Sequence, residues 1–132
     1  MGSGEEKLIV ESGELRVMDR KNLQEKSFLF AIRIVKLCKI LRTQRKEYTL
    51  SNQLLRSGTS IGANISEAQH AQSRPDFLSK LNISLKECAE TEYWLRLLMA
   101  TDYLSDDEFR SIYSDCDELM RILVSSVKTM KE

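Results

Sequence analysis

Residues that end helices are rare in this sequence, and their scarcity limits the folds that it can adopt. Beyond residue 21 the chain of 132 residues contains one proline, Pro75, and two glycines, Gly58 and Gly62. A fold of many short strands needs turn residues about every 8–12 positions, whereas long helices need few. The distribution therefore predicts an all-α protein. A chain of this length fits one domain, which is large enough to bury a sizeable core.

Apolar residues recur at three- and four-residue spacing in four segments, which is the pattern of an amphipathic helix. Only a few residues separate these segments, so successive helices should be antiparallel neighbours. We therefore predict an antiparallel up-down-up-down four-helix bundle that oligomerises and occupies residues 22–132. Its helices are expected over about residues 22–46, 50–71, 73–101 and 105–132.

Two of the helix starts carry clear capping residues. Ser73 can cap the first turn, Pro75 has no N–H group to be left without a partner, and the negative charge of Asp76 suits the helix dipole. Ser105 and Glu108 have the spacing of a capping box, in which each side chain accepts from the backbone N–H of the other residue. These signals predict helix starts close to residues 74 and 106.

Residues 1–21 precede the sustained helical pattern and are predicted to be a tag or a flexible N-terminal arm. The first four, MGSG, resemble an expression tag. The apolar run Leu8-Ile9-Val10 fits a short extended arm, a hairpin or a tag-derived linker, and these alternatives stay open. Neither a signal-peptide pattern nor an apolar run of roughly 18 residues is present, so we expect a cytoplasmic protein without membrane contact.

The first predicted helix has more apolar surface than one bundle core can cover. Phe28, Ile32 and Val35 fall well away from the stripe that includes Phe30 and Ile34. On the third predicted helix, two large apolar residues also lie away from the main stripe. Because a second copy of the chain is the simplest cover for such surfaces, we predict self-association through Phe28, Ile32, Val35, Ile83 and Trp94.

A polar stripe runs beside the core positions of the second helix and continues on the third. Buried polar groups must be hydrogen-bonded, since an unsatisfied group costs several kcal/mol. Our hypothesis is that Arg56 and Asn64 meet Glu87 or Glu90 in a polar layer that sets helix register or subunit geometry. The predicted members of this layer are Gln53, Arg56, Asn64, Glu67, Glu87 and Glu90.

Charge is unevenly distributed although the net charge is zero. Residues 21–58 contain nine Lys or Arg against two acids, and residues 59–132 contain eight against thirteen. Two interpretations stay open: a basic patch that faces nucleic-acid phosphates, or helices of opposite charge packed side by side. The candidate contacts for RNA or DNA are Lys36, Lys39, Arg42, Arg45 and Lys46.

The sequence offers little material for catalysis. His70 is the only histidine, so the pair of Glu67 and His70, which has the spacing of a di-iron motif, lacks the second pair that such a site needs. The three cysteines occupy apolar helical positions and read as small buried hydrophobic residues. Neither a nucleophile elbow nor a phosphate-binding loop is present. We expect no enzyme activity, no cofactor, no metal and no small-molecule substrate.

Residues 51–68, with the sequence SNQLLRSGTSIGANISEA, closely resemble the signature of the bacterial four-helix bundle proteins. These proteins were first noticed as products of intervening sequences in large-subunit ribosomal RNA genes. Residues 76–77 (DF), 81–87 (LNISLKE) and 90–95 (ETEYWL) are similar to the second block of the family, and residues 30–37 (FAIRIVKL) to its first helix. The resemblance covers about residues 22–130 and implies a four-helix protomer that assembles into a homopentameric ring.

A related accessory protein of diversity-generating retroelements is a basic pentamer that binds nucleic acid and a reverse transcriptase. The present chain differs from it in its zero net charge. The leading prediction is therefore a non-enzymatic, homo-oligomeric helical scaffold, a pentamer by resemblance, that serves as an accessory factor associated with nucleic acid. The alternative is a structural or protein-interaction module that does not bind nucleic acid.

Overall fold

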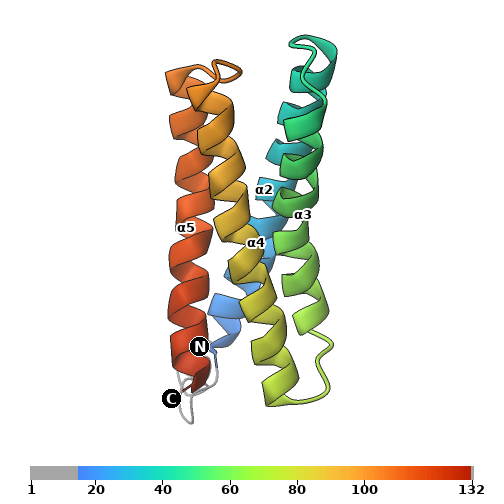
Figure 1. Ribbon diagram of the computed structural model, residues 1–132. Helices are drawn as coiled ribbons and strands as arrows, with labels where there is room; N and C mark the ends of the chain where they lie inside the picture. Colours follow the sequence, from blue (N-terminus) through green and yellow to red (C-terminus); the bar gives the residue numbers. More distant parts are fainter. Residues whose placement is uncertain (1–14, 132) are drawn as a thin grey trace.

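The computed structural model describes residues 15–131 of the chain. Within these residues the chain forms four α-helices and no strand, which confirms the predicted all-α class. Figure 1 shows the helices as neighbouring rods in one bundle. They are α2 (Val17–Thr43), α3 (Thr49–Ala68), α4 (Arg74–Ala100) and α5 (Asp106–Lys131).

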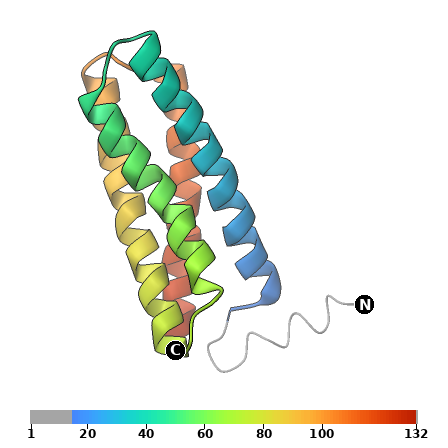
Figure 2. The same cartoon turned by 90° about the vertical axis from the view of Figure 1, so that its right-hand side faces the viewer.

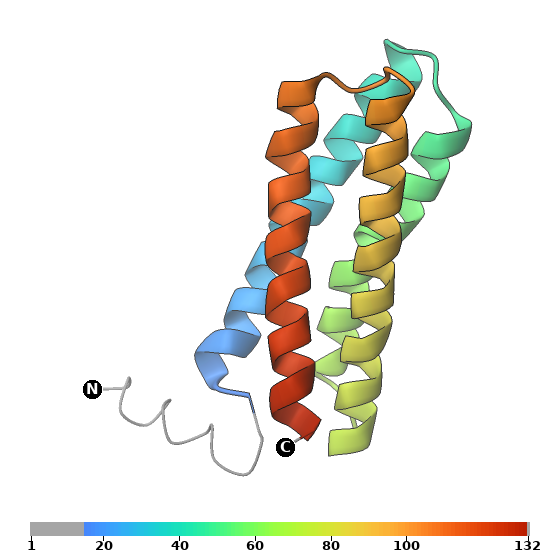
Figure 3. The same cartoon turned by 60° about the vertical axis from the view of Figure 1, so that its left-hand side comes forward.

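The helices are joined by short loops at the two ends of the bundle. Figure 1 shows the α2–α3 and α4–α5 loops at one end and the α3–α4 loop at the other. Each helix packs against two others: α3 lies between α2 and α4, and α5 contacts α4 and, much less extensively, α2. The contact between α2 and α5 is the smallest of the four, and Figure 3 shows α2 running obliquely behind α5. One side of α2 is therefore left open, as the view in Figure 2 illustrates.

The first helix starts and ends earlier than the sequence pattern predicted. It begins at Val17 instead of Asn22, so the boundary placed between residues 21 and 22 cuts through α2. Leu15, just before the helix, is buried against the core and holds its first turn in place. The helix ends at Thr43 because the chain then turns through Lys46, whose φ of 58° is left-handed. Residues 1–14 of the predicted arm lie outside the described part of the chain.

Side-chain caps fix where the other helices start. Ser73 Oγ accepts from Asp76 N at 3.2 Å, which confirms the predicted start of α4. Ser105 and Glu108 form the predicted capping box before α5, with N–O distances of 2.9 and 3.1 Å. The cap of α3 was not predicted: the buried carboxylate of Glu47 accepts from Leu50 N at 2.9 Å and Ser51 N at 2.7 Å.

Each helix contributes one stripe of apolar side chains to a single core. Burying one such side chain stabilises the fold by about 1.5–3 kcal/mol. Cys38, Cys88 and Cys116 are buried in this core as free thiols, in agreement with their predicted apolar role. The largest side chains that are fully buried include Phe30, Ile34, Leu54, Ile61, Leu81, Leu95, Leu119 and Leu123.

Two glycines allow α3 to approach α2 closely. A Cβ added to Gly58 would lie 2.8 Å from Ile34 Cγ1, and one added to Gly62 would lie 3.2 Å from the backbone oxygen of Ser27. Both distances are too short for an undisturbed alanine. Glycine destabilises a helix by about 1 kcal/mol relative to alanine, so these two are retained where the packing leaves no room for a side chain.

Candidate interaction surfaces

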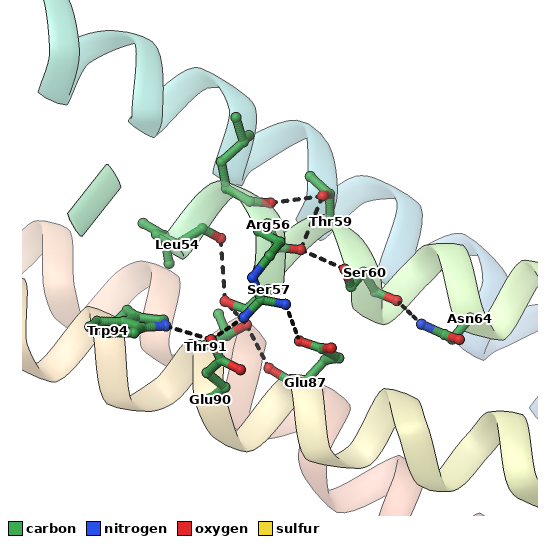
Figure 4. A network of polar contacts seen from close by, with 11 residues as sticks. Leu54, Arg56, Ser57, Thr59, Ser60, Asn64, Glu87, Glu90, Thr91 and Trp94 are labelled. Atoms are coloured by element: carbon green, nitrogen blue, oxygen red, sulfur yellow. Dashed lines mark hydrogen bonds and ion pairs between the residues drawn. The ribbon is translucent and has the colours of Figure 1, made fainter. Parts of the chain in front are cut away.

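The outer seam between α3 and α4 carries a cluster of charged groups. Arg56 on α3 reaches across to α4, where it pairs with Glu87 at 3.3 Å and also with Glu90 (Figure 4). The hydrogen bond to Glu90 is the main reason that the pKa of Arg56 is raised. The Arg56 side chain is 50% exposed, so the cluster is a surface feature of the seam. We call these three residues the α3–α4 charged cluster.

Only half of the predicted polar layer comes together in this cluster. The side chain of Asn64 donates to the backbone oxygen of Ser60 on its own helix at 2.9 Å and does not reach α4 (Figure 4). Glu67 pairs with Lys80, nearer the α3–α4 loop, at 3.0 Å. Gln53 is exposed. The predicted contact of Asn64 with a glutamate of α4 is therefore replaced by a bond within α3, which also satisfies a polar group.

The buried polar contacts between α3 and α4 were missed from the sequence. Thr91 Oγ1 lies 3.0 Å from Ser57 Oγ, and Ser84 Oγ donates to the Ile61 backbone oxygen at 2.9 Å. All three hydroxyl residues have no exposed surface. Serine and threonine at the core spacing of α3 and α4 were the available signal, because small hydroxyl side chains bond locally when they are buried.

Trp94 is more enclosed than its position on the helical wheel suggested. Its indole is partly buried, packs against the core and donates from Nε1 to Glu90 at 2.9 Å. This bond, followed by that from Arg56, lowers the pKa of Glu90. Tyr93 stacks edge-on against the indole at 5.0 Å and is 56% exposed. Trp94 is thus tied to the α3–α4 charged cluster, and Tyr93 is the more exposed aromatic.

The outward side of α2 carries apolar side chains that the described chain leaves partly exposed. Phe28 is 67% exposed, Ile32 37% and Val35 38%. Leu29 beside them is 55% exposed, and Ile83 on α4 is 38% exposed. We call Phe28, Leu29, Ile32 and Val35 the α2 apolar face. Four of the five predicted interface residues are therefore exposed, and three of them share this face.

A surface groove between α2 and α3 continues this face. It has a volume of about 620 Å³, and its lining includes Phe28 and Ala31 from α2 and Thr59, Gly62 and Ala63 from α3. Gly62 and Ala63 line the groove on the α3 side, and Phe28 lines it on the α2 side. We call this feature the α2–α3 groove. Its lining is mainly apolar, which suits the side chains of another polypeptide segment.

The predicted nucleic-acid contacts differ in how far they are free to bind a ligand. Arg45 donates to both carboxylate oxygens of Glu108, at 3.0 and 2.6 Å, and this contact lowers the pKa of Glu108 to about 2. Arg42 donates to Asn52 at 2.7 Å. Lys36, Lys39 and Lys46 are exposed and form no ion pair within residues 15–131. Three lysines, and not the arginines, are therefore the more available cations.

The thiols and the histidine do not assemble into a reactive site. Cys88 and Cys116 face each other across α4 and α5 with their Sγ atoms 3.6 Å apart. The hydrogen bond with Cys88, together with burial, raises the pKa of Cys116, and burial raises that of Cys38 to about 11. The raised pKa values make Cys38 and Cys116 poor nucleophiles. His70 is exposed at the end of α3.

Across residues 15–131, no group of three or more His, Cys, Asp or Glu side chains is placed to hold a metal ion. The same residues include no helix with an apolar stretch sufficient to cross a bilayer. Together with the helix arrangement, these observations define a small four-helix bundle over residues 15–131.

Comparison with known proteins places this bundle in a family. Residues 20–125 match the model of the 23S rRNA-intervening sequence protein family, and the chain belongs to that family. It is also similar to a crystal structure from Bacteroides thetaiotaomicron, a protein with unknown function from the S23 ribosomal protein family. The two chains are 52% identical with a TM-score of 0.82, over 83% of this chain and 98% of the other. No curated protein matches the chain.

Proposed function

We propose that this protein is a non-enzymatic scaffold that associates with copies of itself through the α2 apolar face. The observation that carries the proposal is the exposure of Phe28, Ile32 and Val35 on one side of one helix. Contiguous exposed apolar residues on a soluble chain mark interaction surfaces, because covering them with a partner removes apolar area from water. The number of five subunits comes from the family resemblance alone.

Paired charge-introducing variants test this proposal. Light scattering on a sizing column should give an oligomer for the unmodified chain and a monomer for Phe28→Asp/Ile32→Asp. Val124→Asp is the matched control, because Val124 on α5 is also exposed, at 49%, but lies outside the α2 apolar face. The control should remain oligomeric. The role of α2 would be contradicted if both variants lost association equally, or if neither variant lost it.

We further propose that the assembled protein contacts RNA or DNA phosphates through Lys36, Lys39 and Lys46. The supporting observation is that these side chains are exposed and form no ion pair within the described residues, whereas Arg45 is committed to Glu108. Repetition around an oligomer would bring several such groups to one ligand. Because binding to phosphates releases counterions, affinity should fall steeply with salt.

Gel shift with mixed RNA and DNA at two salt concentrations tests the nucleic-acid proposal. The change Lys36→Glu/Lys39→Glu should weaken retardation, and Lys128→Glu, an exposed lysine on α5, is the control. If the unmodified oligomer does not retard RNA or DNA even at low salt, the result would favour the alternative, a structural or protein-interaction module. That alternative is favoured by the same exposed α2 apolar face, which needs a protein partner and no nucleic acid.

A further inference from the structure

Near the α2–α3 loop, at one end of the bundle (Figure 1), an exposed aromatic side chain lies close to a contact between α2 and α3. Tyr48 is 51% exposed at the start of α3. Its backbone oxygen accepts from Asn52 N at 3.3 Å, so the two residues lie on successive turns of one side of α3. The Asn52 side chain accepts from Arg42 of α2 at 2.7 Å. Tyr48 is therefore one helical turn from the point where α2 supplies a guanidinium group.

A surface hollow between α2 and α3 continues from this contact. It has a volume of about 340 Å³, and its lining includes Val35, Lys39 and Arg42 from α2 and Leu55 from α3. We call this feature the Lys39 hollow. Leu55 follows Tyr48 by seven residues, which is close to two helical turns, so both lie on the same side of α3. The hollow thus offers apolar contacts and positive charge beside an exposed ring.

Acids are nearly absent from this part of the chain. Between residues 26 and 66 the only acid is Glu47, and its buried carboxylate is bound to the first N–H groups of α3. The cations of the same stretch that do find an acid find it on α4 or α5. They are Lys26, Arg33, Arg45 and Arg56. The stretch therefore supplies no exposed carboxylate to the cations beside the Lys39 hollow.

Four cations in the second half of α2 and the α2–α3 loop pair with no acid among residues 15–131. They are Lys36, Lys39, Arg42 and Lys46. Arg42 bonds to the neutral side chain of Asn52, so its positive charge is not compensated there. In proteins that bind single strands, bases stack on exposed aromatic rings while cations follow the phosphates. The bases of a duplex are already stacked on one another, so they cannot use such a ring.

We propose that Tyr48 and the Lys39 hollow bind an unpaired strand of RNA or DNA. One base stacks on the Tyr48 ring, a neighbouring base packs against Leu55 in the hollow, and a phosphate contacts Arg42. This inference rests on the proposed contact with nucleic acid and adds which kind of strand is bound. Lys39 lies one turn beyond Val35, the last residue of the α2 apolar face. Self-association and strand binding therefore use successive parts of α2.

Fluorescence anisotropy of the unmodified full chain with three matched probes tests the proposal. The probes are a labelled oligouridine, the same strand paired with oligoadenosine, and an abasic strand of the same length. A surface that binds phosphates alone should prefer the duplex, because the duplex has the higher charge density. The proposal predicts the opposite order: the single strand should bind about tenfold more tightly than the duplex or the abasic strand at the same salt concentration.

The three probes also separate this inference from the proposed function on which it rests. If the duplex or the abasic strand binds as tightly as the single strand, the role of the bases is overturned, whereas the contact with phosphates stands. If none of the probes binds at low salt, the contact with nucleic acid and the preference for a single strand are both overturned.

Substitution of the exposed tyrosines tests the stacking directly. Tyr48→Ala should weaken binding of the oligouridine by about 5- to 100-fold, as expected for the loss of one stacked base. Tyr48→Phe keeps the ring and should bind as the unmodified chain does. Tyr93→Ala is the matched control, because Tyr93 on α4 is 56% exposed and lies outside the Lys39 hollow, and it should leave binding unchanged. Equal losses in the two alanine variants, or no loss in Tyr48→Ala, would overturn the role of Tyr48.

Discussion

The α3–α4 seam and the outer side of α2 both appear in the sequence as a second stripe beside the core, but the structure treats them differently. On the seam, Arg56, Glu87 and Glu90 satisfy one another within the chain. On α2, the side chains of Phe28 and Ile32 are left partly exposed by the described residues. Polar side chains can be satisfied by a neighbouring helix or by water, whereas apolar side chains need cover. The difference is why the proposed self-association is assigned to α2 and not to the α3–α4 seam.

The largest expected effect separates the inner side of α2 from its outer side. Ile34 has no exposed surface, and Ile34→Ala should lower the free energy of unfolding by about 2–5 kcal/mol. Ile32 is 37% exposed, and Ile32→Ala should change the free energy of unfolding by less than about 1 kcal/mol while weakening association. Urea unfolding of both variants provides the measurement. Equal losses of stability would show that Ile32 is part of the protomer's own core.

A smaller loss is expected where α3 approaches α2. Gly58→Ala places a methyl group 2.8 Å from Ile34, whose side chain is enclosed and cannot move freely. We expect a net loss of about 1–3 kcal/mol in urea unfolding, in spite of the better helix propensity of alanine. Ser66→Ala, at an exposed position of α3, is the control and should be neutral or slightly stabilising. A stabilised Gly58→Ala protein would contradict the close packing.

A pH-dependent effect is expected on the α4–α5 side, away from both regions. Glu92 Oε2 is buried and has no hydrogen-bond partner among residues 15–131, and desolvation followed by the charge of Asp117 raises the pKa of Glu92. Because this pKa is raised, the folded state favours the protonated form of Glu92. The stability that the side chain contributes is therefore present at low pH and is lost as pH rises through the raised pKa.

Glu92→Gln should therefore raise the free energy of unfolding at pH 7 by up to about 1 kcal/mol. The gain should disappear below the ordinary pKa of a glutamate, where the unmodified side chain is also neutral. Thermal unfolding at pH 7 and pH 4 checks this expectation. The opposite trend, with a gain only at pH 4, would show that Glu92 is satisfied as an anion.

The smallest effect is expected for the α3–α4 charged cluster. Arg56 is half exposed, so Arg56→Ala should change the free energy of unfolding by less than about 1 kcal/mol. The difference in stability between the unmodified protein and Arg56→Ala should be smaller in high salt than in low salt, because salt screens exposed ion pairs. A loss above about 3 kcal/mol is typical of breaking a buried ion pair and would contradict the exposed position of the cluster.

The helices were predictable from the sequence because their signals are local. The three- and four-residue spacing identified the core stripes, and Ser73 and Ser105 identified two of the helix starts. The start of α2 was placed too late, because the first turn packs beside Leu15, whose burial depends on tertiary packing. The cap at Glu47 escaped notice for a similar reason: its carboxylate accepts from the next helix only after a left-handed turn at Lys46.

The interaction surfaces were predicted in part. Angular position on a helix correctly indicated that Phe28, Ile32 and Val35 face outward. It did not indicate the enclosure of Trp94, because a large indole covers the neighbouring seam and bonds to Glu90. It also did not reveal that Arg45 pairs with Glu108, since these residues are distant in sequence and meet only at one end of the bundle. Long side chains thus limit what the backbone pattern can predict.

Sedimentation velocity of the unmodified full chain, over a range from about 1 to 100 µM, tests most directly whether the α2 apolar face needs a second copy. Self-association through this face predicts a species larger than the monomer that becomes dominant as concentration rises and that is lost in Phe28→Asp/Ile32→Asp. A monomer across the whole range would contradict it.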